Sequence, residues 1–130
     1  MDLNIINIIK NLKGLRTLPP LSEQTIDAAE IKLGLKFADD YKSYTKQFGA
    51  VSANGRELTG VVDVPRLNVV NVTEAERRLN NNIPDDMYVI ENTGVDGILI
   101  LQNAVGEIFN IMPNAKPEKK FNSLAEYLDE

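Results

Sequence analysis

The stretch that decides the fold class runs from residue 87 to residue 112 and reads MYVIENTGVDGILILQNAVGEIFNIM. It contains three runs of β-forming residues, over 87–91, 98–102 and 107–112, separated by two segments with turn-forming asparagine and glycine. Because connections this short join neighbouring strands in opposite directions, we expect three antiparallel strands. The run 98–101 is apolar at every position, so both faces of this strand need cover, from the first helix or from a partner.

Upstream of this stretch, between residues 2 and 49, apolar residues recur at the spacing of amphipathic helices. Each of three predicted helices begins at a side chain that can cap or start it and is followed by a glycine. These start and stop residues are Asp2 and Gly14, Ser22 and Gly34, and Asp39 and Gly49. The positions expected to face the core are Leu3, Ile5, Ile6, Ile8, Ile9 and Leu12 in the first helix, Ile26, Ala29, Ile31 and Leu33 in the second, and Tyr41, Tyr44 and Phe48 in the third.

Between these helices and the meander, Asn54-Gly55 predicts a turn, and β-forming residues over 58–64 and 67–72 predict two strands. Two sequences, at 73–76 and 123–126, have the form of a capping box. The first predicts a short helix that ends near Leu79, and the second predicts a terminal helix after a loop. Helices first and a meander afterwards indicate the α+β class: a single domain over 1–130, with a largely antiparallel sheet packed against N-terminal and C-terminal helices.

The 130 residues include neither cysteine nor histidine. This excludes cysteine nucleophiles, Ser-His-Asp triads and imidazole-ligated metal sites. The 19 acidic and 14 basic residues give a net charge of −5, which disfavours direct binding to nucleic acid or an anionic membrane and would steer a basic partner toward the chain. The first residues lack the features of a signal peptide, and no apolar run approaches the roughly 20 residues that span a bilayer, so we expect a cytoplasmic protein.

Four blocks of residues resemble the SMI1/KNR4 family, the SUKH superfamily. They are an opening helical motif from Leu21 to Gly49, then Gly60, then Ile83-Pro84 with 88–90, the turn 94–97 and the hairpin residues 106–108, and last Phe121 with Leu124 and Leu128. The resemblance covers about residues 20–130. The chain has Ala38 where the family usually has proline and Lys120 where a serine commonly precedes the aromatic residue, and it lacks the tryptophans frequent in the family's sheet.

The resemblance implies an SMI1/KNR4-like fold and a function in binding rather than in chemistry. Bacterial members are mostly immunity proteins that bind and neutralise a toxin, often a nuclease from a polymorphic or contact-dependent system. Fungal relatives are instead regulatory interaction proteins. We therefore expect a non-catalytic protein, without cofactor or metal, whose partner is a cognate toxin domain such as a basic nuclease. The alternative is a regulatory adaptor that is not linked to a toxin.

Carboxylates in predicted turns and at strand ends are the candidate contacts for such a partner, because an anionic surface can occupy a basic cleft. The candidates are Asp63, Asp85, Asp86, Glu91, Asp96 and Glu107, with Asp39 and Asp40 as further members of an anionic surface. Each has a structural alternative as a helix cap, a turn residue or a solvated sheet edge. The strand period puts Tyr88 and Ile90 on one face and Val89 and Glu91 on the other, and it leaves open which face the helices cover.

Paired carboxylates also serve hydrolases, and Asn92 with Asp96 loosely suggests a calcium loop. The spacing of the EF-hand loop and its closing glutamate are missing, and no serine has a histidine or a Ser-x-x-Lys partner to activate it. A carboxylate hydrolase is therefore a third hypothesis, after the two binding functions.

Overall fold

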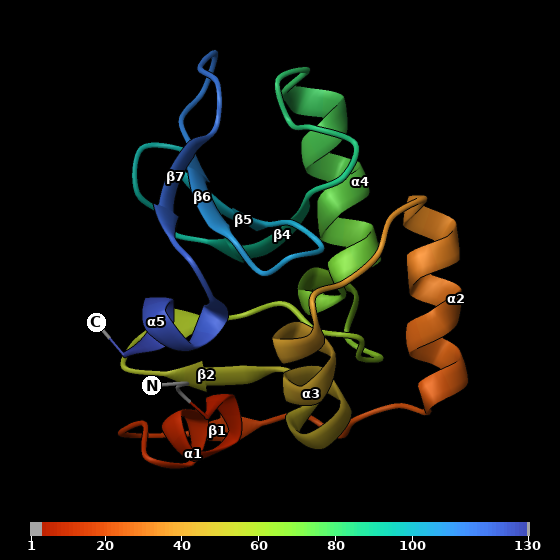
Figure 1. Ribbon diagram of the computed structural model, residues 1–130, viewed down its shortest axis with the longest axis vertical. Helices are drawn as coiled ribbons and strands as arrows, with labels where there is room; N and C mark the ends of the chain where they lie inside the picture. Colours follow the sequence, from red (N-terminus) through yellow and green to blue (C-terminus); the bar gives the residue numbers. More distant parts are fainter. Residues whose placement is uncertain (1–3, 130) are drawn as a thin grey trace.

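The computed structural model describes residues 4–129, and within this range it consists of two antiparallel sheets and surrounding helices (Figure 1). The helices are α1 (Ile5–Lys10), α2 (Glu23–Leu33), α3 (Asp39–Phe48), the 3-10 helix η1 (Pro65–Leu67), α4 (Val69–Leu79) and α5 (Leu124–Leu128). The strands are β1 (Arg16–Thr17), β2 (Val51–Ala53), β3 (Arg56–Glu57), β4 (Tyr88–Asn92), β5 (Leu99–Gln102), β6 (Ile108–Ile111) and β7 (Glu118–Phe121). The α+β class and the antiparallel meander are confirmed.

The two sheets are joined by an isolated bridge and a hydrogen bond. The first has the order β1-β2-β3 and the second the order β4-β5-β6-β7, with every pair antiparallel. Leu58 forms an isolated bridge with Glu91, and the amide of Thr59 donates to the carbonyl of Ile90 at 2.9 Å. Strand β7, which the sequence did not predict, extends the meander by one strand.

The helix boundaries mostly follow the predicted caps. The Ser22 hydroxyl caps α2 by accepting from the Thr25 amide, and Gly34 ends that helix in the left-handed region. Asp39 is the first residue of α3, but the cap position belongs to Ala38, and no side chain caps it, so a capping role for Asp39 is wrong. The predicted cap Asp2 lies outside the described residues, as does Leu3; in the described part of α1 the side chain of Asn4 is the cap.

The segment 58–72 differs most from the prediction. The expected strand over 67–72 is wrong, because Asn68 caps α4 by accepting from the amides of Val70 and Asn71. Thr73 is consequently not a cap but a buried residue inside α4, and its hydroxyl accepts from the Val89 amide at 3.0 Å. The expected strand over 58–64 is reduced to isolated bridges at Leu58 and Gly60. Burial of Val69, Val70 and Thr73 on one helical face outweighs the β propensity of these residues.

The second sheet carries apolar side chains on both faces, and those of the two faces belong to different clusters. Its inner face packs against α1, α3 and α5 through Tyr88, Ile90, Ile100 and Ile108. Its outer face, with Val89, Leu99, Leu101 and Ile111, packs with Ile83 and Met87 and with the partly buried side chains of Val72 and Phe109. The second side of 98–101 is therefore covered by α4 and the segment before β4 rather than by the first helix.

The predicted core positions of the second helix need one correction. Ile26, Ala29 and Leu33 are buried, but Ile31 is 81% exposed, and Glu30 is buried in its place. The Glu30 carboxylate accepts from the Phe37 amide at 2.7 Å, which ties the end of α2 to the start of α3. The aromatic face of α3, with Tyr41, Tyr44 and Phe48, is buried as predicted.

Gly60 is the position with the least space for a side chain. A methyl group there would overlap the backbone carbonyl of Gly49, and φ at Gly60 is not in the left-handed region. We predict that Gly60→Ala lowers the free energy of unfolding by at least about 3 kcal/mol or prevents folding, because the clash is with backbone and not with a mobile side chain. Urea denaturation measures this, and Gly55→Ala is the control, since Gly55 has open space but a positive φ. A Gly60→Ala protein as stable as Gly55→Ala would contradict the packing described.

Candidate functional site

Glu91 lies on the inner face of the second sheet because β4 contains a bulge. Between Val89 and Glu91 the register shifts, so that Val89 faces Leu101 whereas Glu91 faces Ile100 across the strand pair. The extra residue, Ile90, and Glu91 therefore both lie on the side covered by helices. Strict alternation along the strand puts Glu91 on the face opposite Tyr88 and Ile90, whichever face the helices cover. In the structure all three side chains share one face.

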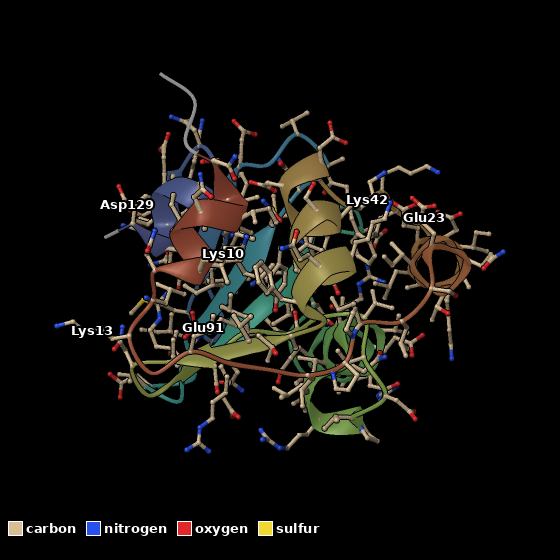
Figure 2. All side chains as sticks on the ribbon, turned by 90° about the horizontal axis from the view of Figure 1, so that it is seen from below. Lys10, Lys13, Glu23, Lys42, Glu91 and Asp129 are labelled. Atoms are coloured by element: carbon tan, nitrogen blue, oxygen red, sulfur yellow. The ribbon has the colours of Figure 1, made fainter. Side chains whose placement is uncertain are left out.

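The Glu91 side chain is the centre of a buried polar cluster. Glu91 is 4% exposed, and its carboxylate accepts from Arg56 Nη2 at 3.2 Å and from the hydroxyl of Tyr127. The Arg56 guanidinium lies 4.7 Å from the centre of the Tyr127 ring, in a cation–π arrangement. The cluster joins β3, β4 and α5. Figure 2 shows Glu91 inside the molecule, whereas the side chain of Lys13 points outward into solvent. Glu91 therefore holds the C-terminal helix in place and does not present its charge to solvent.

Asp85 and Asp86 lie exposed in the turn before β4, and Arg77 of α4 positions this turn. Arg77 Nη2 donates to the carbonyl of Asp85 at 3.0 Å and approaches that of Met87 at 3.5 Å, while Nη1 donates to the carbonyl of Leu33 at 3.3 Å. One guanidinium thus ties the end of α2, helix α4 and the entry to β4 together. Among residues 4–129, neither Asp85 nor Asp86 has a cationic partner.

Glu107 lies at the same end of the second sheet as Asp85 and Asp86. In an antiparallel meander β4 and β6 start at one end, and Glu107 immediately precedes β6. Its carboxylate accepts from Lys119 Nζ at 2.7 Å and from Asn103 Nδ2 at 2.9 Å, and these donors hold its pKa below the usual value. The structure therefore gathers three of the six candidate carboxylates at one end of the sheet.

The remaining candidates lie elsewhere. Asp96 is in the turn between β4 and β5, at the opposite end of the second sheet, with a positive φ. Asp63 is exposed in the bend before η1. Asp40 is half-buried: its carboxylate accepts from the Leu124 amide at 2.8 Å and from Gln102 Nε2 at 3.0 Å, and burial raises its pKa. Asp40 therefore supports the start of α5 and adds little to the surface charge.

Sequence reasoning missed Arg56, Tyr127 and Arg77, whose partners lie between eight and 44 residues away along the chain. No local pattern signals an ion pair 35 residues apart or a guanidinium bound to three carbonyls. The Ser123–Glu126 capping box gave a partial signal for α5. The Ser123 hydroxyl accepts from the Glu126 amide as predicted, but the Glu126 carboxylate accepts from the Asn122 amide and not from that of Ser123.

One groove of the surface carries side chains of both charges. This groove of about 400 Å³ lies between α2 and α3, with Glu23, Asp27 and Asp39 facing Lys42 and Lys46, and Figure 2 labels Glu23 and Lys42 there. Lys46 and Glu23 pair at 2.8 Å across it. Within the described range 4–129, no three acidic side chains come together in a way that could hold a metal ion. In the same part of the chain, no helix is both long and apolar enough to cross a bilayer.

Comparisons with known proteins agree with this architecture. A family model described as SUKH_5, SMI1-KNR4 cell-wall, matches residues 3–130. A crystal structure of a protein from Pseudomonas syringae pv. tomato has a similar fold, with a TM-score of 0.79 and 14% sequence identity over 97% of this chain and 94% of that chain. At this identity the likeness concerns the fold alone. A comparison with curated protein sequences gave no match.

We predict that Glu91→Gln lowers the free energy of unfolding by about 1–3 kcal/mol. The substitution removes a buried negative charge to which Arg56 and Tyr127 donate hydrogen bonds. Glu107→Gln removes a charge from a pair at the surface and should cost clearly less than Glu91→Gln does. Urea denaturation of both variants at one ionic strength provides the comparison. Equal effects would show that the Glu91 cluster adds nothing beyond a surface ion pair.

The four tyrosines give a prediction for alkaline pH. Burial raises the pKa of Tyr41, Tyr44, Tyr88 and Tyr127 above the usual value, and at Tyr127 the Glu91 carboxylate adds to this effect. The unfolded chain loses these protons near pH 10 and the folded chain does not, so stability is unaffected by tyrosine below that pH and falls above it. Each tyrosine contributes up to about 1.4 kcal/mol per pH unit. Tyrosinate absorbance at high pH should appear only together with the loss of circular dichroism; titration of any tyrosine in the folded protein would contradict this.

Proposed function

The chain belongs to the SMI1-KNR4 family, and from this premise we propose that it is an immunity-type protein that binds another protein and blocks it without catalysis. The partner is a cognate toxin domain with a basic surface, such as a nuclease, and the encounter takes place in the cytoplasm. The observation that carries the proposal is the match of the family model to residues 3–130.

The distribution of charge supports a basic partner. The chain carries a net charge of −5, and the carboxylates inside the protein are bound by groups of the chain itself. Glu30, Asp40 and Glu91 are held in this way. The exposed carboxylates of Asp85 and Asp86 have no cationic partner within residues 4–129, so they are free to attract a basic surface. Long-range attraction of this kind raises the association rate more than the affinity.

Occlusion of a toxin's cleft requires only a modest part of this surface. A stable interface buries about 1,600 Å² in total, or about 800 Å² on each partner. The accessible surface of this chain is 7258 Å², so about a ninth of it would suffice. A rigid domain with a small number of anchoring side chains and a polar rim meets this requirement.

The proposal predicts protection in a coexpression assay. The product of the adjoining gene is expressed alone and together with this chain; we expect growth arrest in the first case and growth in the second. Gly60→Ala, which should be strongly destabilised or unfolded, is the control for protection by a folded domain. Growth arrest that this chain fails to relieve, together with binding to a partner that is not toxic, would support the regulatory adaptor instead.

A further inference from the structure

Two of the most exposed apolar side chains lie near the acidic end of the second sheet. Leu79, at the end of α4, is 81% exposed, and Val105, in the hairpin between β5 and β6, is 78% exposed. Neither contributes to a core cluster of the described residues. Large apolar side chains that are exposed together mark surfaces for other molecules more often than isolated ones do.

The topology brings these residues to one side of the second sheet. Thr73 of α4 contacts Val89, and Arg77 contacts Asp85 and Met87, so the later turns of α4 lie beside the segment before β4. Val105 lies in the hairpin that follows β5, and β5 ends beside the start of β4, with Gln102 opposite Tyr88. Figure 1 shows this hairpin and the segment before β4 on the same side of the sheet, next to α4.

Leu79 continues the side of α4 that faces the sheet. Val72 packs on the outer cluster, and Leu79 follows it by seven residues, or two helical turns, so the two side chains share a helical face. The apolar side of α4 that packs on the outer face of the second sheet thus continues, beyond the sheet, to the exposed side chain of Leu79. Phe109 of β6, which lies opposite Leu101 on the same outer face, is only partly buried.

We propose that the hairpin-end surface, formed by Leu79, Asp85, Asp86, Val105 and Glu107, is the place where the basic toxin domain docks. The inference rests on the proposed function and names its binding surface. Leu79 and Val105 are the apolar anchors, and the two unpaired aspartates form the rim that attracts lysine and arginine side chains beside an apolar depression of the partner. Glu107 is neutralised by Lys119 and contributes shape more than charge.

Two features favour a basic protein over a second copy of this chain. The rim carries Asp85 and Asp86 without a cationic partner in the described residues, so two such surfaces facing each other would repel. The surface is also held in place before binding, because Arg77 binds the backbone of Asp85 and Met87 from α4. A surface ordered in advance loses little conformational entropy when a partner binds.

The test uses the purified toxin domain against which the chain protects, and measures association and dissociation rates with variants of this chain. The anchor variant is Leu79→Ser with Val105→Ser, and its control is Ile31→Ser, since Ile31 is also 81% exposed but lies on α2. The rim variant is Asp85→Asn with Asp86→Asn. Its control is Asp63→Asn with Asp96→Asn, because both pairs change the net charge from −5 to −3.

We expect the anchor variant to weaken binding at least about tenfold, mainly by faster dissociation, while Ile31→Ser leaves it unchanged. The rim variant should slow association about tenfold at low salt, and more than its charge-matched control does. Thermal unfolding of all variants should match that of the wild type, because every altered side chain is exposed.

Three results would overturn the inference, and they are distinguishable. If the wild-type chain does not bind the toxin domain, both the proposed function and this surface fail. If it binds and protects but the anchor and rim variants behave like their controls, the surface is wrong and the function stands. If the chain forms dimers that Leu79→Ser dissociates, the surface is an interface between copies of the chain.

Discussion

The hydroxyl group of Thr59 links helix α3 to the second sheet. It donates its single proton to the carbonyl of Val89 at 2.8 Å, so the hydroxyl of Tyr41, 2.8 Å away, must donate to it. Tyr44 donates to the carbonyl of the same threonine and accepts from the amide of Val51 in β2. Two tyrosines of α3 thus satisfy polar groups of Thr59 and of β2, and Thr59 satisfies a carbonyl of β4, inside the apolar core, where an unpaired polar group is costly.

This requirement explains why tyrosine occupies three buried positions of the core, Tyr41, Tyr44 and Tyr88. Tyr88 continues the network, since its hydroxyl donates to Gln102 and accepts from the amide of Ala38. Gln102 in turn donates to Asp40 and to the carbonyl of Gly106. Each buried polar atom in this chain of bonds has a partner, and satisfied networks of this kind specify one arrangement of the surrounding elements. The polar residues of this network therefore stabilise the fold.

The predictable features of this fold are those that depend on local patterns. The meander between residues 87 and 112, the caps at Ser22 and Ser123 and the aromatic face of α3 follow from period and capping, which involve residues at most a few positions apart. The bulge at Ile90 could not be predicted, because it depends on how β4 pairs with β5. The burial of Glu91 could not be predicted either, because the bulge interrupts the strand alternation from which the face of Glu91 was inferred. Asp85 and Asp86 were predicted as turn residues, and nothing local indicated that Glu107 lies at the same end.

The covering of both faces of the second sheet leaves few places where another protein can bind. The inner face is filled by α1, α3 and α5, and the outer face is largely filled by α4 and the segment before β4. The free edge at β7 carries Lys119 and Lys120 in ion pairs, and charged side chains of this kind discourage the addition of a further strand. Loops at the ends of the strands remain, supported by a rigid sheet, and such loops are where binding residues concentrate in many domains. Of the two ends, the one that holds Asp85, Asp86 and Val105 is bound to α4 through Arg77, so its shape is set by the core itself.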